Sequence, residues 1–342
     1  MMGTIICQKV VVSTCLDRAP CESILPIRSY QTKQQDQTGM PRRKTRKHRK
    51  TSRKARWNEH PARPGPKVCS PLAETRRNGS SSCLPSDVVK RIASTLPTRG
   101  GSAGDNTNTT KELAKELGCK KDNSRCIIER SLLSHKEKKA LLNAYFRPKM
   151  PDEWKKNPQM WLSSDDISNV MQQYEKAYPE FRFLGVVPID FSAPDPYSPG
   201  PKKCMNNQFC EVNLAEEKSK GRRILGAVFN LDPHYKSGSH WIALAIDLQR
   251  NCVYYFDSYG IAPPNQIARF MRYLTLQEPR LKLQSNGRRF QYSDTECGMY
   301  SMYFIIRMIA GESFKKFCKN PIHDKWMIEF RNTLFDNNST AV

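Results

Sequence analysis

Cys297 stands directly before Gly298 and a long apolar run, in the stretch SDTECGMYSMYFIIRMIAG. This pattern predicts a buried helix over 297–310 with Cys297 at its N-terminus. The free N–H groups there and the positive end of the helix dipole favour a thiolate, which is the nucleophilic form of cysteine. Taken alone, a cysteine at the start of a core helix is more often structural, since free cysteine is among the most buried residue types.

Two further residues flank a pair of strand-like segments. Residues 241–246 are apolar without alternation, which is typical of a central strand covered on both faces, and a second apolar strand follows a polar turn. A hairpin centred on 248–249 would place His240 directly opposite Asp257, with Cβ atoms roughly 4.5–5.5 Å apart. Asp257 would then accept the Nδ1–H of the imidazole and hold its tautomer, the role of the acid in a catalytic triad.

Gln291 lies in the polar loop that leads into Cys297. Its side-chain N–H₂ group, beside the backbone N–H of Cys297, would form an oxyanion hole, in which one donor typically lowers the barrier by about 2.7–4 kcal/mol. His240 would act as the acid toward the leaving amine. Each of these residues alone has an ordinary structural explanation, but the four residue types together, each beside its expected element, indicate a thiol peptidase.

The chain contains 12 cysteines, and no two of them have C-x-x-C spacing. A structural zinc site is therefore disfavoured, and we expect no metal and no cofactor. Because the N-terminus lacks a convincing signal peptide, the thiols are predicted to be reduced and intracellular. Cys204 and Cys210 lack the local signature of a papain-like nucleophile. Cys252 and Cys318 are interpreted as core thiols rather than nucleophiles. His234 is expected to lie beside the cleft, and His323 to be a surface or hydrogen-bonded histidine.

The elements that would position these residues occupy the C-terminal part of the chain. A polar cap and an acidic first turn predict a helix that begins near Ser164. A strand-like run, three more strand candidates, a helix and a short strand follow. Their ranges are, in order, 181–191, 222–231, 240–248, 252–258, 263–276 and 288–293. Helices outside a sheet of consecutive strands predict an α+β domain.

The net charge of +23 is unevenly distributed. In residues 41–56, ten of sixteen residues are Lys or Arg and none is acidic. Such a block repels itself and cannot bury apolar surface, so 1–83 is predicted to be a disordered basic tail. Three interpretations of the block stay open: contact with nucleic acid or another polyanion, a nuclear-localisation signal, and a solvated tail. Amphipathic patterns predict a helical region over 84–150, before the domain at 151–342.

A family resemblance emerges from the order of these motifs. His-Trp opens one strand, Phe-Asp-Ser ends the next, and Gln291 stands six residues before Cys-Gly. This set resembles the superfamily of SUMO-deconjugating and adenovirus-type cysteine proteases, and WLSSDDI at 161–167 is similar to that family's Trp-Leu-x-x-x-x-Ile motif. The resemblance covers roughly residues 151–318. It implies the papain-like adenovirus/SUMO-protease fold, with a central mixed sheet and flanking helices. In organisation the chain is most similar to the virion-maturation proteases of large nucleocytoplasmic DNA viruses.

The resemblance also implies roles for individual residues. The base, the orienting acid, the nucleophile and the oxyanion donor would be, in that order, His240, Asp257, Cys297 and Gln291.

Substrate-binding residues follow from the same resemblance. Trp241 and Trp161 would line a narrow tunnel that admits a Gly-Gly or Gly-x segment, and Asp165 or Asp166 would contact the substrate backbone. One departure is Glu296, where the family more often has Asp; the charge is retained, so we expect the mechanism to survive.

The sequence therefore predicts a thiol endopeptidase that cleaves after Gly-Gly-x or Gly-x sites and processes viral structural precursors during virion maturation. One alternative is a deconjugating protease for ubiquitin-like modifiers, and a second is a non-enzymatic nucleic-acid-binding protein on a protease scaffold. Expected partners are proteins with glycine-rich cleavage sites, and DNA through residues 41–56. We expect a monomer that does not bind membranes, since no apolar run is long enough to span one, located in the virion and host cytoplasm or, alternatively, in the host nucleus.

Overall fold

The computed structural model describes residues 13–14, 68–76, 82–97, 106–120, 123–196 and 204–337. The basic block at 41–56 and most of the expected tail lie outside the described residues. In the ranges given, no helix has the length and the apolar character needed to cross a membrane.

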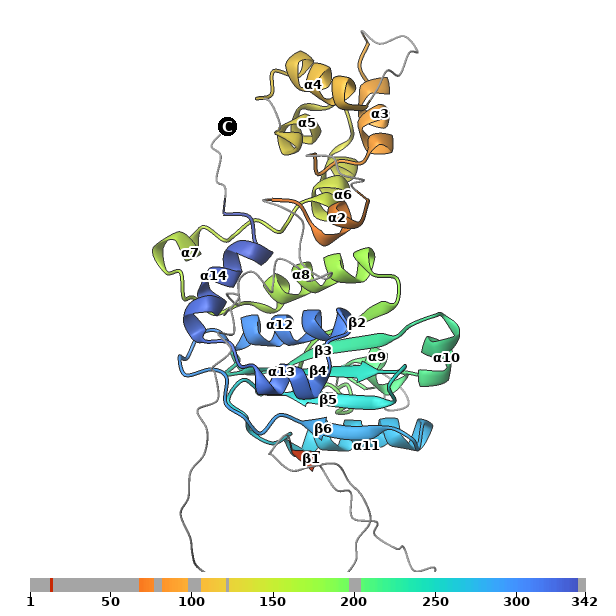
Figure 1. Ribbon diagram of the computed structural model, residues 1–342, viewed down its shortest axis with the longest axis vertical. Coiled ribbons are helices and arrows are strands. Elements are labelled where there is room, and N and C mark those ends of the chain that lie inside the picture. The colour runs from red at the N-terminus through yellow and green to blue at the C-terminus, as the bar shows by residue number, and fades with distance from the viewer. Residues whose placement is uncertain are drawn as a thin grey trace, which may run out of the picture.

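A mixed sheet forms the centre of the C-terminal domain, which has the predicted α+β class (Figure 1). Its order is β1-β6-β5-β4-β3-β2, with β4 antiparallel to both of its neighbours, β3 and β5, and the remaining neighbours parallel. The strands are β1 (Ser13–Thr14), β2 (Phe181–Pro188), β3 (Ile224–Asn230), β4 (Trp241–Asp247), β5 (Cys252–Phe256) and β6 (Lys282–Ser285). All seven residues of β4 are buried, which confirms that it is a central strand covered on both faces.

Helices cover both faces of the sheet. One face packs against α8 (Ser164–Ala177), α12 (Cys297–Ile309), α13 (Phe314–Lys319) and α14 (Asp324–Leu334), which share one apolar core with it. The other face packs against α9 (Asn207–Cys210), α10 (Leu214–Ser219) and α11 (Asn265–Gln277). Helix α12 is buried at every position except Arg307, as the apolar run predicts. Helix α8 begins at Ser164, as its polar cap predicts.

The hairpin of β4 and β5 has a different register from the expected one. Ala243 pairs with Phe256 and Asp247 with Cys252, so the strands are shifted by two residues. The Asp247 carboxylate accepts hydrogen bonds from the backbone N–H groups of the turn at 249 and 250, at 3.1 and 2.8 Å, which favours a longer turn. A shift of two keeps every side chain on its face of the sheet.

The expected strand at 288–293 is wrong. These residues form a loop in which the backbone N–H groups of Phe290 and Gln291 both donate to the Ser258 carbonyl, at 2.8 and 2.9 Å. The strand that pairs with β5 is instead β6, six residues earlier, and it runs parallel to β5.

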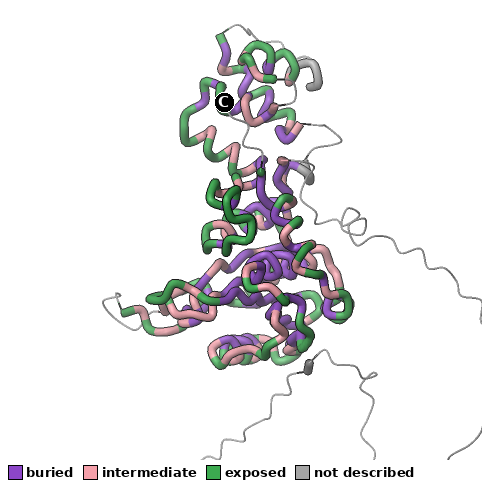
Figure 2. The backbone as a smooth tube through the Cα atoms, turned by 90° about the vertical axis from the view of Figure 1, so that its left-hand side faces the viewer, coloured by how far each residue is buried: buried purple, intermediate pink, exposed green. Residues whose placement is uncertain are grey.

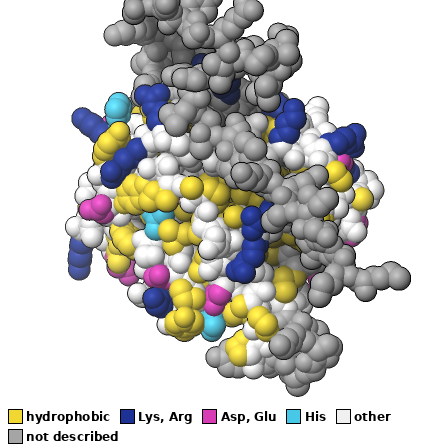
Figure 3. Space-filling model, turned by 90° about the horizontal axis from the view of Figure 1, so that it is seen from below, with side chains coloured by type: hydrophobic (Ala, Val, Ile, Leu, Met, Phe, Trp, Pro, Cys, Tyr) yellow, Lys and Arg dark blue, Asp and Glu magenta, His cyan; other side chains and the backbone are white. Residues whose placement is uncertain are grey.

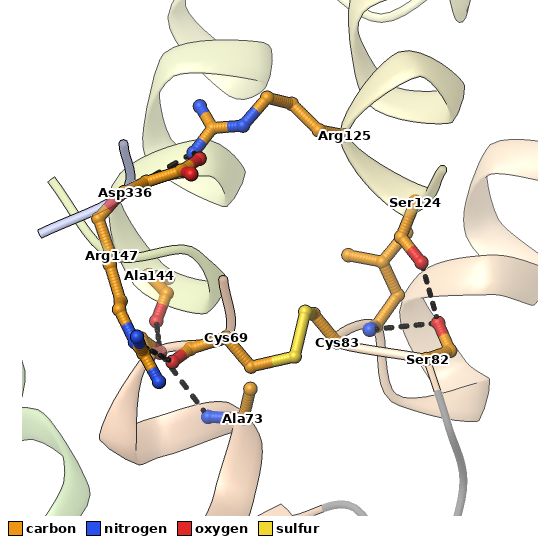
Figure 4. The surroundings of a disulfide bond; sticks show 11 residues. Cys69, Ala73, Ser82, Cys83, Ser124, Arg125, Ala144, Arg147 and Asp336 are labelled. Carbon is orange, nitrogen blue, oxygen red and sulfur yellow. Dashed lines mark hydrogen bonds and ion pairs between the residues drawn. A yellow bond between two sulfur atoms is a disulfide. The ribbon is translucent and has the colours of Figure 1, made fainter. Parts of the chain in front are cut away.

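The N-terminal helical region has a hydrophobic core of its own, and Figure 2 shows buried segments both there and around the sheet. Its helices are α2 (Pro71–Arg76), α3 (Ser86–Ser94), α4 (Asn106–Glu116), α5 (Ser124–Arg130) and α6 (His135–Tyr145); a short helix, α7 (Glu153–Lys156), follows. The region includes residues before the expected start at 84, because Cys69 pairs with Phe146 and is disulfide-bonded to Cys83 (Figure 4). Part of the expected tail is therefore folded.

The prediction that the cysteines are reduced is wrong for six of them. Disulfides join Cys69 to Cys83, Cys119 to Cys126, and Cys204 to Cys210, with Cα atoms 5.2, 5.8 and 6.4 Å apart. These separations are within the range that a disulfide can bridge. Sequence spacing alone cannot reveal such approaches. Cys252, Cys297 and Cys318 remain buried thiols.

The helical region is joined to the domain through the end of α14. The Arg147 guanidinium donates to the carbonyls of Cys69 and Asn332, both at 3.1 Å, and Arg125 pairs with Asp336 at 3.0 Å. Figure 4 shows the part of this network around the disulfide. One arginine side chain therefore connects the first folded residues of the helical region to the last helix of the domain.

Candidate active site

His240 and Asp257 meet at the open end of the hairpin. His240 Nε2 lies 2.8 Å from Asp257 Oδ1, and both side chains are buried. The expected orienting atom was Nδ1, but the structure uses Nε2. The Asp257 backbone is fixed by Asn286, whose side chain accepts from its N–H at 2.9 Å and donates to its carbonyl at 2.6 Å. Asp257 is therefore a rigid acceptor.

Cys297 is the first residue of α12, and it is buried. Burial of the ring lowers the pKa of His240, but the interactions of the ring with Asp257 and with the Cys297 thiol outweigh burial and raise that pKa to about 9. A protonated imidazole and a thiol that interact in this way can supply the acid and the nucleophile of an acyl transfer.

Tyr259 contacts both His240 and Asp257, a role that the sequence analysis did not predict. Its ring stacks on that of His240 with centroids 4.6 Å apart, and its backbone N–H donates to Asp257 Oδ1 at 2.8 Å. The Arg289 guanidinium lies over the ring, 5.0 Å from its centroid. No sequence signal identifies this role, because the stacking depends on how two loops meet.

Gln291 is fully buried in the loop before α12. Its Oε1 accepts a hydrogen bond from Ser258 Oγ at 2.7 Å, and its Nε2 donates to the Ser293 carbonyl at 2.7 Å. These contacts fix the amide group. The contribution of Gln291 to an oxyanion hole stays a prediction, because one proton of Nε2 is used by the protein itself.

A groove of about 500 Å³ is lined by both predicted tryptophans, Trp161 and Trp241, and by His234. His234 therefore lies beside the cleft, as we expected. Trp241 is 6% exposed and donates from Nε1 to the Leu162 carbonyl at 3.1 Å, whereas Trp161 is 44% exposed. A Cβ atom on Gly298 would lie 2.8 Å from Leu162 Cδ1 and 3.2 Å from Trp241 Cδ1. The groove wall is therefore packed against the first turn of the cysteine helix.

The two acidic residues expected to bind substrate differ from each other. Asp166 Oδ2 accepts from the backbone N–H and the hydroxyl of Ser163, at 2.8 and 2.7 Å. These bonds complete a capping box that starts α8. Asp166 therefore has a capping role, and its contact with substrate stays a prediction. Asp165 is exposed on the first turn, and its contact with substrate stays a prediction.

Glu296 precedes Cys297 and is fully buried. It forms a two-pronged ion pair with Arg331 of α14, at 3.0 and 2.9 Å. No spacing in the sequence identifies Arg331 as the partner of Glu296. Among the described residues, no group of three or more His, Cys, Asp or Glu side chains could hold a metal ion.

Comparisons with known proteins agree with this geometry. Residues 223–342 match the family model for the Ulp1 protease family, C-terminal catalytic domain. A protein of Acanthamoeba polyphaga mimivirus, named as a thiol protease, is 32% identical over 187 residues, which are 52% of this chain and 57% of that protein. The chain thus spans a little more than half of that relative.

Two further similarities come from African swine fever virus. A cysteine protease of the Tick/Malawi isolate is 24% identical over 276 residues, which cover 74% of this chain and 91% of the relative. The crystal structure of a protease of this virus aligns with a TM-score of 0.54 and 23% identity, over 80% of this chain and 97% of that one. This similarity confirms the expected fold, a mixed sheet with flanking helices.

Proposed function

We propose that this chain, whose residues 223–342 form a cysteine peptidase domain of the Ulp1 family, is a viral thiol endopeptidase that cleaves protein precursors after glycine-containing sites. The observation that carries the proposal is the meeting of three side chains. Cys297 stands at the N-terminus of a buried helix, its thiol interacts with the His240 ring and helps to raise the pKa of that ring, and His240 is paired with Asp257 at 2.8 Å.

The reaction follows from these positions. The Cys297 thiolate attacks the scissile carbonyl carbon, and the protonated His240 gives its proton to the leaving amine as the C–N bond breaks. A thioester forms at Cys297. Water, deprotonated by His240, then attacks the thioester and releases the acid product. Asp257 holds the ring throughout, and the backbone N–H of Cys297 together with Gln291 stabilises the oxyanion.

The groove supports a preference for glycine beside the cleaved bond. Trp241 and Leu162, which line the groove, pack against Gly298 in the first turn of α12, and a constriction between the groove and the nucleophile is part of the proposal. Residues without a side chain pass such a constriction most easily. Gly-Gly-x and Gly-x sites are therefore the proposed substrates.

Virion maturation is the proposed setting, supported by the resemblance and by the viral origin of the relatives. DNA contact is proposed through residues 41–56. On the described face seen from below, basic, acidic and hydrophobic side chains are interspersed (Figure 3). Contacts with phosphate would allow movement along DNA without sequence specificity.

A second candidate function is removal of a ubiquitin-like modifier. One African swine fever virus relative, 32% identical over 134 residues and matched over 49% of its own length, is named as a SUMO-1 cysteine protease. Release of a modifier that ends in Gly-Gly at a rate similar to that of a virion-precursor peptide would favour this function.

The test compares the purified full-length chain with Cys297→Ala and with Cys318→Ala, a matched control at another buried thiol. The substrates are Gly-Gly-x and Gly-x-Gly peptides, an Ala-Ala-x peptide and a fusion to a ubiquitin-like modifier, each with and without DNA. We expect the wild type and Cys318→Ala to cleave the glycine peptides and Cys297→Ala to cleave nothing. Absence of cleavage by the wild type would favour the binding-protein alternative, and cleavage by Cys297→Ala would exclude our nucleophile.

A further inference from the structure

A buried ion pair is anchored one residue before the nucleophile. Glu296 and Arg331 are 0% and 2% exposed. Their two-pronged contact, Nε to Oε2 at 3.0 Å and Nη2 to Oε1 at 2.9 Å, is the strongest geometry available to this pair of groups. Thr295 Oγ1 also donates to Glu296 Oε1, at 3.2 Å. The carboxylate is therefore held on both oxygens.

Arg331 is fixed from its other side by an aromatic ring. Its guanidinium lies 4.6 Å from the ring centroid of Trp154 in α7, and Trp154 packs edge-on against Phe335 with centroids 4.9 Å apart. Removing the two charges from water costs free energy that their attraction offsets only in part. Replacement of a buried ion pair by apolar residues is therefore often neutral or stabilising for the fold. A charged pair kept at such a position suggests a role besides stability.

The backbone connects this pair directly to the nucleophile. Glu296 is the residue that caps α12, and its carbonyl accepts the N–H of Tyr300 at 2.9 Å. On the opposite side of the first turn, Gly298 is packed against Leu162 and Trp241. The backbone on either side of Cys297 is therefore held, at Gly298 by packing against Leu162 and Trp241 and at Glu296 by the ion pair with Arg331.

We propose that Arg331 is a positioning residue for Cys297, which acts by fixing and neutralising the Glu296 carboxylate next to the thiol. This role rests on the proposed function of Cys297 as the nucleophile. Without Arg331, Glu296 would be an unpaired buried carboxyl group one residue before the thiol, and its ionised form would oppose both a thiolate at Cys297 and the helix dipole. The other titratable or charged groups around the thiol come from three loops: His240, Asp257, Tyr259, Arg289 and Asp294. All of these remain in an Arg331 variant.

The test measures alkylation of Cys297 by iodoacetamide against pH, with the modified peptide quantified by mass spectrometry. We expect Arg331→Met to slow alkylation at neutral pH by roughly tenfold or more, as the midpoint moves up by about one pH unit. The double variant Glu296→Gln with Arg331→Met, which has no buried charge, should return the midpoint toward the wild-type value. Arg331→Lys keeps the positive charge but loses the two-pronged guanidinium contact with Glu296. We therefore expect the midpoint of Cys297 alkylation in this variant to be unchanged and kcat to fall.

A matched control lies at the other end of the same helix. Arg307 Nε pairs with Glu312 Oε2 at 2.6 Å, and both side chains are largely buried. Arg307 lies in the last turn of α12, whereas Cys297 is its first residue, so this ion pair is far along the helix from the thiol. Arg307→Met should lower the melting temperature and leave the alkylation profile unchanged. A profile in Arg331→Met that superimposes on the wild type, or one that the double variant fails to restore, would overturn the proposal.

Alkylation requires no substrate, so the two proposals can fail separately. The wild type could cleave none of the peptides while the pH profile of Cys297 alkylation depends on Arg331. That result would support the positioning role and exclude the proposed substrates. If cleavage depends on Cys297 while Arg331→Met changes neither kcat nor the profile, the proposed function stands and the positioning role falls.

Discussion

His240 and Tyr259 lie face to face, with ring centroids 4.6 Å apart and planes inclined by 14°. The stack covers one face of the imidazole, and the same tyrosine donates its backbone N–H to the aspartate that orients this imidazole. The ring and the acid are therefore held by one residue.

We expect Tyr259→Ala to reduce kcat by roughly 2- to 12-fold, because an aromatic stack contributes about 0.5–1.5 kcal/mol. Tyr259→Phe keeps the stack and should retain near wild-type kcat. Steady-state assays on a Gly-Gly-x peptide distinguish the two. Equal losses in both variants would assign the effect to the hydroxyl group instead.

The raised pKa of His240 links stability to pH. Its value of about 9 in the folded protein exceeds the value of about 6.5 for an unfolded histidine. The resulting stabilisation is fully present below about pH 6.5 and is lost as the pH rises through about 9. We expect the free energy of unfolding in urea to fall by roughly 3 kcal/mol over this range. Asp257→Asn should flatten the decline, and an unchanged slope in that variant would contradict the pairing.

Gly298→Ala should impair the site through packing. The new methyl group would come within 2.8 Å of Leu162 Cδ1, and such overpacking typically costs about 1–3 kcal/mol. We expect lower thermal stability and a lower kcat/KM. Combining it with Leu162→Ala should recover part of the kcat/KM, whereas full activity in the single variant would exclude the tight contact.

The Cys69–Cys83 disulfide should stabilise the helical region. A loop of this length, with a sequence separation of 14, corresponds to about 3 kcal/mol in the chain-entropy model. Replacing both cysteines with serine should lower the melting transition of this region, followed by hydrogen exchange of α2 to α6. The matched variant at Cys204 and Cys210 should affect the α9 region instead. Rapid alkylation of Cys69 in the native, unreduced protein would show that the bond is absent.

The sequence was most informative where a function depends on local pattern. Cys297 before an apolar helix and His240 before an apolar strand were identified because their elements could be recognised independently. The predicted pairing of His240 with Asp257 is correct although the predicted register of the hairpin is wrong. A shift of two residues keeps both side chains on the same face of the sheet. The turn length itself depended on how the Asp247 side chain caps the turn.

Other features required tertiary structure. Arg331 meets Glu296 only because α14 packs beside the start of α12, and no spacing rule connects the two. The cysteines that form disulfides are likewise brought together by packing of short helices. The capping bonds of Asp166 to Ser163 likewise appear only in the structure, and substrate contact by Asp165 or Asp166 stays a prediction.

The Glu296–Arg331 pair also has a consequence for synthesis of the protein. A growing chain that already contains His240, Asp257 and Cys297 still lacks α14. At roughly 5–20 residues per second, Arg331 is added about 2 to 7 s after Cys297. During that interval Glu296 has no buried partner, so the nucleophile is not yet held in place. The order of translation would thus place the proposed nucleophile in its final position only after α14, the last described helix, has been synthesised.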